Sequence, residues 1–163
     1  MSSFSRRHVT LGLLAAPLAA CGFTPVYAPG GPGTLLRQSV RVEPPETRQE
    51  FELVARLEER LGVPSAPSFA LTHELSVSQQ SVAITGTDDV LRVRINGSVG
   101  YALVEAASDA QVLAGRVATF TEYSTFGTTL ATDAAERDAT DRLMVALADQ
   151  IVAELLAGAT RLL

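Results

Sequence analysis

Residues 91–103 read LRVRINGSVGYAL, a stretch in which apolar side chains occupy alternate positions. Successive side chains of a β-strand point to opposite faces, so this period of two predicts a strand with one buried face and one polar face. The apolar set comprises Leu91, Val93, Ile95, Val99, Tyr101 and Leu103, and the polar set comprises Arg92, Arg94, Asn96 and Ser98. A sheet built on this strand therefore has one core face and one face free to meet a partner.

Three further segments predict strands. Residues 37–42 alternate weakly, residues 69–78 alternate strictly, and residues from about 112 to 123 alternate irregularly around Arg116 and Phe120, which suggests a β-bulge. His73 falls on the apolar side of its strand. We interpret it as a structural histidine, because no second histidine follows residue 20 to share a metal ion.

Two segments predict amphipathic helices. The first begins after Pro45, with Thr47 and Glu50 at the spacing of a capping box, and ends at Gly62. Its expected apolar stripe is Phe51, Val54, Leu57 and Leu61, and its expected exposed pair is Glu52 with Arg56. The second helix repeats Leu143, Leu147, Ile151 and Leu155 at every fourth residue. The predicted order is β-α-β-β-β-α, an α+β fold.

The beginning of the chain has the three parts of an export signal. Arg6 and Arg7 form a basic start, residues 9–16 are apolar, and small residues lead to Cys21. The apolar run is shorter than the roughly 20 residues that a membrane-spanning helix needs. Residues 18–21, LAAC, resemble the lipobox of bacterial lipoproteins, which implies lipid attachment at Cys21. The alternative is an ordinary secretory signal followed by a cysteine by chance.

Export route and destination follow from neighbouring residues. Arg6 and Arg7 fit either a twin-arginine signal or an ordinary basic start. Gly22 is not the aspartate that commonly retains lipoproteins in the inner membrane, so resemblance to that sorting rule favours a lipid anchor on the periplasmic side of the outer membrane. We therefore expect a signal peptide at 1–20, a lipidated flexible tether rich in proline and glycine at 21–36, and a single domain at 37–163.

Composition restricts the function classes. Loss of both signal arginines from the 13 basic residues leaves 11 against 18 acidic ones, and none is lysine. Such an acidic chain argues against nucleic-acid binding. With one histidine, no tryptophan and no metal-ligand spacing after residue 20, we expect no cofactor, no metal ion and no catalysis. A hydrolase using His73 stays open as an alternative, although no nucleophile motif supports it.

Several groups of residues together resemble the LptE family of lipopolysaccharide-assembly lipoproteins. They are Cys21, Gly22, Phe23, Pro25, Val26 and Tyr27, the strand at 92–103, and Tyr123, Ser124, Phe126, Ala131, Ala135, Leu143 and Ile151. The resemblance implies two helices packed on one face of a four-stranded, mostly antiparallel sheet. It also implies an outer-membrane lipoprotein that plugs the LptD β-barrel, assists assembly of that barrel and helps to transport lipopolysaccharide to the cell surface.

The same resemblance makes Arg92 and Arg94 candidate contacts for lipopolysaccharide or a partner, since arginine can grip phosphate through paired hydrogen bonds. Ordinary strand surface, or pairing with Glu74 on the neighbouring strand, is the alternative for these two residues. An accessory lipoprotein subunit of another envelope transport system would share the anchor and the domain, and it remains a second functional hypothesis.

Overall fold

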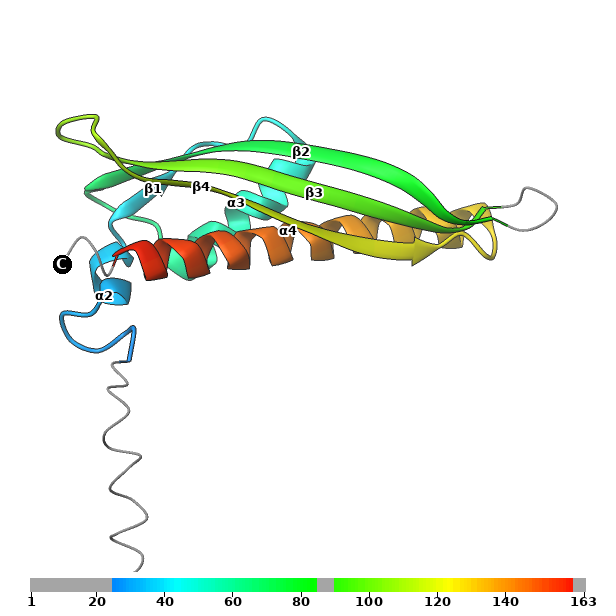
Figure 1. The fold of residues 1–163 in the computed structure, drawn as a ribbon, viewed down its shortest axis with the longest axis horizontal. Helices are drawn as coiled ribbons and strands as arrows, with labels where there is room; N and C mark the ends of the chain where they lie inside the picture. The colour runs from blue at the N-terminus through cyan, green and yellow to red at the C-terminus, as the bar shows by residue number, and fades with distance from the viewer. Residues whose placement is uncertain (1–24, 85–89, 160–163) are drawn as a thin grey trace, which may run out of the picture.

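The computed structural model describes residues 25–84 and 90–159 (Figure 1). Its elements are α2 (Pro32–Leu36), β1 (Val40–Val42), α3 (Arg48–Leu61), β2 (Phe69–Ile84), β3 (Val90–Glu105), β4 (Gln111–Ser124) and α4 (Thr129–Ala159). The strands form one sheet in the order β1-β2-β3-β4. β1 is parallel to β2, whereas β2, β3 and β4 are antiparallel. The α+β fold class is confirmed, and α2 is an addition to the predicted order.

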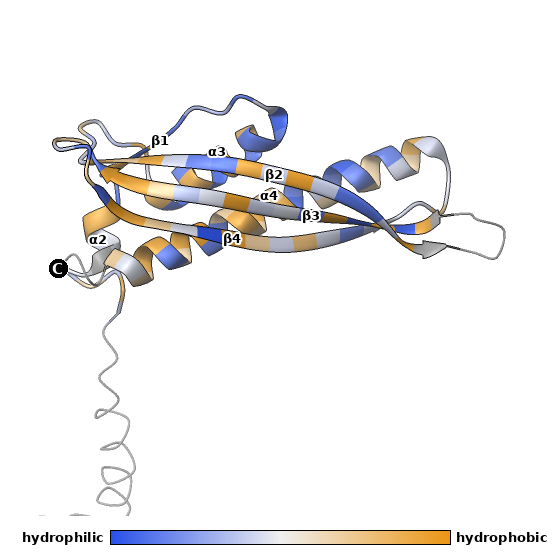
Figure 2. Cartoon of the chain, turned by 45° about the horizontal axis from the view of Figure 1, so that its top comes forward, coloured by the Kyte–Doolittle hydropathy of each residue, from blue (hydrophilic) through white to orange (hydrophobic). Residues whose placement is uncertain are grey.

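The helices lie on one face of the sheet. Figure 1 shows the 31-residue α4 running along the sheet, with α3 beside part of its length and α2 at the end where α4 finishes. The strands alternate between hydrophilic and hydrophobic residues along their length (Figure 2), as the period of two predicts. No helix among the described residues is long and apolar enough to cross a membrane.

β3 buries the side chains that its sequence pattern selected. Val93, Ile95, Val99, Tyr101 and Leu103 are all buried on the helix side of the sheet, while Leu91, near the strand end, is exposed. α4 packs directly over Gly97 of β3, where a Cβ atom would lie 2.9 Å from Leu147 Cδ1 and 3.0 Å from Leu143 Cδ2. This glycine interrupts the apolar alternation because the helix occupies the space of its side chain.

β4 has one irregularity, but it lies at the start of the strand and not around Arg116 and Phe120, where the sequence pattern suggested a β-bulge. Its pairing with β3 runs without a shift from Leu113 to Ser124, and the one shift leaves Val112 of β4 as an extra residue, since Leu103 pairs with Leu113 and Val104 with Gln111. Arg116 and Phe120 instead take regular positions on the face away from the helices. The alternation looks irregular because the side toward the helices includes Gly115, which leaves room for Tyr101 and Glu154, and Thr121, whose hydroxyl donates to the Ala139 carbonyl of α4.

α3 confirms the predicted capping box and corrects the predicted stripe. Thr47 Oγ1 accepts from the Glu50 amide at 3.2 Å, and Glu50 Oε2 accepts from the Thr47 amide at 2.9 Å. Phe51 was wrongly placed in the buried stripe, since it is 60% exposed and Leu53 is buried instead. The buried stripe turns toward Leu53 because α3 packs against α4 as well as the sheet.

Arg56 corrects a second expectation, the exposed pair with Glu52. Its Nε and Nη2 donate to the two carboxylate oxygens of Asp149 on α4 at 3.1 and 3.0 Å, and its Nη1 donates to Glu59 at 2.7 Å. Arg60 Nη1 donates to the same Asp149 carboxylate at 2.9 Å. Two arginines of α3 therefore hold one carboxylate of α4, and this bidentate contact fixes the helices side by side.

The tether expected at residues 21–36 contains α2. Leu36 at its end is fully buried in the core, and Gln38 donates its amide to the Leu61 carbonyl at 2.7 Å. The packed part of the domain therefore includes α2, and within the described residues the chain before Pro32 forms turns. Cys21 lies outside the described residues.

We expect Thr47→Ala to lower the free energy of unfolding by about 0.5–2 kcal/mol, because the Glu50 amide loses its side-chain acceptor at the start of α3. Urea unfolding followed by circular dichroism measures this change. Ser65→Ala is the matched control, since Ser65 is an exposed loop residue. Equal midpoints for the two variants would contradict a stabilising cap.

Candidate functional site

The sheet face opposite the helices carries Arg92 and Arg94. Both belong to β3, and strand alternation places them on the face away from buried Val93 and Ile95. The side chain of Arg92 is 59% exposed and that of Arg94 is 37% exposed. The structure thus puts both predicted site residues on the open face, next to each other on one pleat.

Glu122 of β4 is the acidic partner of these arginines. It stands directly opposite Arg94 in the β3–β4 register, and Arg94 Nε and Nη2 donate to Glu122 Oε1 at 2.9 and 2.7 Å. Arg92 Nη1 lies 3.6 Å from Glu122 Oε2, an ion pair beyond ordinary hydrogen-bond distance. Glu74 was the wrong partner, because it lies opposite Gly100, further along the strand pair.

Phe120 completes this group on the open face. The Arg94 guanidinium carbon lies 4.3 Å from the centroid of the Phe120 ring, a cation–π distance, and the ring remains 53% exposed. Arg94 is therefore held by a carboxylate and a ring, whereas among the described residues the ion pair of Arg92 is the longer contact to Glu122, and Arg92 is the more exposed of the two. Sequence reasoning flagged Phe120 only as an irregularity and missed Glu122, because both depend on the β3–β4 register.

A shallow hollow of about 340 Å³ lies beside Phe120 on the open face. The residues that line it are mostly small or neutral and polar: Ser76, Ser78, Asn96, Gly97, Ser98, Ala118, Thr119 and Phe120. Hydroxyl and amide groups can donate and accept hydrogen bonds without carrying charge. This face therefore combines a neutral polar trough with a cationic end at Arg92.

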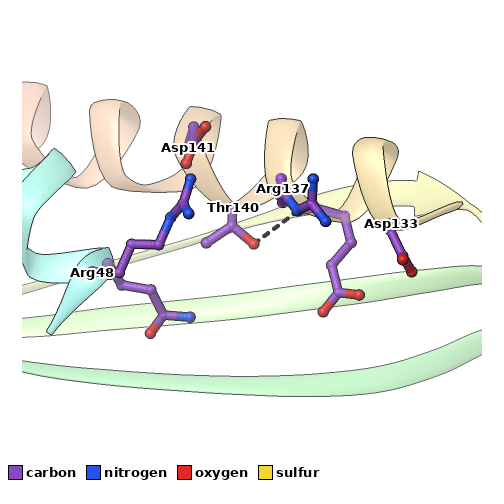
Figure 3. Close-up of a pocket in the computed structure, with 7 residues that line it drawn as sticks. Arg48, Asp133, Arg137, Thr140 and Asp141 are labelled. Carbon is purple, nitrogen blue, oxygen red and sulfur yellow. Dashed lines mark hydrogen bonds between the residues drawn. The ribbon is translucent and has the colours of Figure 1, made fainter. Parts of the chain in front are cut away.

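A second hollow, of about 310 Å³, lies between the start of α3 and the first half of α4. Figure 3 shows Arg48 of α3 and Asp141 of α4 pointing toward one another, with Arg137 and Asp133 further along α4. Both signs of charge alternate over this surface, so no single-sign field develops to collect an ionic ligand.

A cavity lies beside His73, the residue on which the hydrolase alternative depends. The cavity beside it, of about 240 Å³, is lined by carboxylates, a proline and a leucine: Glu43, Pro44, Glu46, Glu50, Glu74 and Leu75. No hydroxyl or thiol lines this cavity among the described residues, so a nucleophile is missing from its wall. His73 Nδ1 is buried and has no hydrogen-bond partner in the part of the chain that the structure describes.

Carboxylates around His73 belong to local structure. Glu50 accepts from the Glu46 and Thr47 amides, and the Glu46 contact is the largest cause that lowers the pKa of the Glu50 carboxyl. Nowhere in residues 25–84 and 90–159 do three or more histidine, cysteine, aspartate or glutamate side chains gather to hold a metal ion.

Tyr101 forms a buried contact on the helix side of the sheet. Its hydroxyl donates to Glu154 Oε2 of α4, in the space that Gly115 leaves open. Burial is the largest cause that raises the pKa of Tyr101, and the hydrogen bond to Glu154 adds to it, because both favour the neutral phenol. This pair ties α4 to β3 and lies away from the open face.

We expect stability to fall as the pH rises above about 10, the pKa of an unfolded tyrosine. Below that pH both states keep the phenol proton, so the contribution of Tyr101 is complete. Above it the unfolded chain loses the proton, while the raised pKa keeps it on folded Tyr101. Urea midpoints against pH measure the effect. Tyr101→Phe should reduce the alkaline decline, of which a part remains because burial raises the pKa of Tyr123 as well, and Tyr27→Phe, at an exposed tyrosine, should leave the decline unchanged.

The fold and the open face together define a class: a small α+β domain with helices on one side of its sheet and an open polar face on the other. Residues 37–155 match the model of the family described as LptE, lipopolysaccharide-assembly. Since that match covers most of the 163 residues, the chain belongs to the LptE family.

Solved structures agree with this assignment. A putative lipoprotein from Caulobacter crescentus CB15 superposes with a TM-score of 0.63 at 25% identity, covering 80% of this chain and 97% of that one. The rare lipoprotein B from Shewanella oneidensis gives 0.59 at 14% identity, covering 76% and 96%. A minor lipoprotein from Acinetobacter baumannii gives 0.54 at 17% identity, covering 73% and 89%. No curated protein matches the chain by sequence.

Proposed function

We propose that the chain is an outer-membrane lipoprotein, anchored through Cys21, that assists assembly of the LptD β-barrel and transport of lipopolysaccharide to the cell surface as a plug of that barrel. The observation that carries the proposal is the LptE family match along residues 37–155. The lipobox at residues 18–21 lies outside the matched residues and supports the proposal independently of that match.

The shape of the domain suits a tethered binding role. The chain enters at the end of the domain where α2 lies, and the sheet and α4 extend away from that end (Figure 1). A lipid at Cys21 would hold the domain at the membrane and raise its effective concentration near a membrane partner. The plug interface then needs less intrinsic affinity than an interface between freely diffusing proteins.

Binding, rather than catalysis, is the activity that we propose. The open face offers neutral polar groups and exposed arginines, Arg92 among them, and the cavity beside His73 has no nucleophile among the described residues that line it. Binding lipopolysaccharide requires recognition of its phosphates and sugars, and arginine with hydroxyl and amide groups recognises both.

Co-purification tests the proposed function. The full-length protein, tagged at its C-terminus, is recovered from detergent-solubilised outer membrane and the bound proteins are identified by mass spectrometry. The expected result is a large outer-membrane β-barrel in near-stoichiometric amount. Recovery of inner-membrane transport components alone would instead support an accessory subunit of another envelope system and would contradict the plug.

For the ligand, we propose that Arg92 contacts the anionic groups of lipopolysaccharide and that Arg94 orients Glu122 and Phe120 beside it. Arg92→Ala should weaken binding to purified lipopolysaccharide about tenfold, because a hydrogen bond to a charged group is worth about 1.5–3 kcal/mol. Arg142→Ala is the control, since Arg142 is equally exposed on α4 and paired with Asp138. Equal loss in both variants would indicate nonspecific charge attraction.

Glu122→Gln provides the complementary test. This change removes the carboxylate that competes for both arginines, so binding of lipopolysaccharide should become tighter. Unchanged affinity in a stably folded variant would contradict a role for these arginines in anion binding.

A further inference from the structure

The edge of β2 continues far beyond the strand that covers it. β1 is three residues long and pairs with Phe69–Leu71 only, whereas β2 runs on to Ile84. Pro44 and Pro45 follow β1 and cannot donate backbone hydrogen bonds to a ladder, so the chain turns away there. Among the described residues, no strand pairs with this side of β2 after Leu71.

The hydrogen bonds between β1 and β2 identify the backbone groups on this edge. The Phe69 amide donates to Ser39 at 3.0 Å and the Leu71 carbonyl accepts from Glu43 at 2.9 Å, both toward β1. The Ser68 carbonyl accepts from Ala106 on the opposite side, at the end of β3. The backbone amide and carbonyl of one strand residue point to the same edge of the strand, and successive residues point to opposite edges. The open edge is therefore formed by the amides and carbonyls of Leu75, Val77, Gln79 and Ser81.

The side chains along this edge give it little protection. Residues 75–82 read LSVSQQSV, which contains no charged residue and no proline. Exposed edge strands usually carry charges, prolines, bulges or a cover that prevents pairing with another chain. The opposite edge strand, β4, does carry Arg116 and Glu122. On β2 the first irregularity is the register shift after Ser81.

The polar character of this edge matters as much as its lack of charge. Serine and glutamine keep the strand soluble before it meets a partner, while their neutral side chains do not repel an incoming strand. Gln79 also donates through Nε2 to Glu136 of α4 at 2.7 Å, which braces the edge against the helix layer. A braced, neutral strand with unpaired backbone groups is a template for strand addition.

We propose that β2, from Leu75 to Ser81, accepts an extended segment of the barrel partner as an added antiparallel or parallel strand. This inference rests on the proposed function, since it names where that partner binds. A closed barrel wall has no free edge, so the donated segment must come from a loop or terminus that leaves the wall. It carries an apolar side chain beside half-buried Leu75 and Val77, small polar side chains beside Ser76 and Ser78, and no charge.

The test compares two substitutions at one position in the full-length protein recovered with its barrel from solubilised outer membrane. Gln79→Pro removes an amide that faces the open edge, and edge strands tolerate proline. Gln79→Ala keeps that amide and loses the same Glu136 contact, so it is the matched control. We expect Gln79→Pro to reduce the recovered barrel at least about tenfold and Gln79→Ala to recover it normally, with similar thermal unfolding of both variants.

Residue-resolved hydrogen exchange gives a readout that does not depend on substitution. In the free protein the amides that face the open edge should exchange fast, and those paired with β3 should exchange slowly. In the complex with the barrel, exchange should slow at least about tenfold at alternate residues, in the pattern of an added strand. The amides concerned are those of Leu75, Val77, Gln79 and Ser81.

The outcomes separate the two proposals. Normal barrel recovery with Gln79→Pro, together with fast edge amides in the complex, would overturn strand addition and leave the plug function standing. Failure of the unaltered chain to recover any barrel would overturn both. A third outcome is a dimer of the purified chain that Gln79→Pro disrupts and Gln79→Ala preserves, with hydrogen exchange of the edge amides unchanged on barrel binding. That outcome would identify a second copy of the chain, instead of a barrel segment, as the added strand, and it would overturn the inference.

Discussion

Leu147→Ala is expected to lower the free energy of unfolding by about 2–5 kcal/mol, the range for removing a fully buried leucine side chain. Leu147 is completely buried in the middle of α4, and its Cδ1 atom packs over Gly97 on β3. The glycine has no side chain with which to fill the space, so the surrounding core cannot close the cavity cheaply. Since domains of this size are stabilised by only about 5–15 kcal/mol, a large share of the stability would be lost.

Val145→Ala on the same helix is the matched control. Val145 is 38% exposed and points away from the sheet, so its truncation should change the free energy of unfolding by about 0.5 kcal/mol or less. Urea titrations monitored by circular dichroism give both values. Equal destabilisation by the two variants would contradict the packing of α4 onto the sheet through the Leu147 face.

The period of two in the strands and the spacing of four in the helices predicted the core, because the burial of one face alone determines these patterns. β3 shows this best: Val93, Ile95 and Val99 were selected from alternation and are buried in the structure. The capping box at Thr47 and Glu50 was equally predictable, because both partners lie within one helical turn. In each case the interaction is local in sequence.

The errors concern contacts between elements that are distant in sequence. Phe51 was assigned to the buried stripe of α3, but the stripe turns toward Leu53 because α4 packs beside it. Arg56 was expected to pair within its helix and instead binds Asp149, 93 residues away. The period of a helix indicates that one face is buried, but it does not indicate on which side a second element, here α4, packs against the helix.

The open face was predictable as a surface but not as a site. Strand alternation placed Arg92 and Arg94 on it, whereas the identity of their partner depended on strand register. The register of β3 with β2 and with β4 decides whether Glu74 or Glu122 lies opposite an arginine, and no local sequence pattern fixes that register. The open edge of β2 was hidden for a similar reason, because the shortness of β1 matters only once β1 is known to pair with Phe69–Leu71.

The proposed lipid attachment at Cys21 leads to a prediction with an all-or-none outcome. Cys21→Ala should abolish incorporation of labelled palmitate into the protein, because Cys21 is the only cysteine of the chain and its thiol is the acceptor that the lipobox provides. Ser39→Ala, which leaves the lipobox intact, should label normally. Labelling that persists in Cys21→Ala would contradict lipid attachment at this residue.

Loss of the lipid should also reduce barrel recovery without unfolding the domain. Several acyl chains make release from a membrane slow, whereas an unlipidated domain loses the high effective concentration that the anchor gives it. We expect less barrel with Cys21→Ala at normal expression and restored recovery when the variant is overproduced, since the binding surfaces of the sheet are unchanged. A Cys21→Ala protein that recovers no barrel at any concentration would show that the lipid itself is part of the interface.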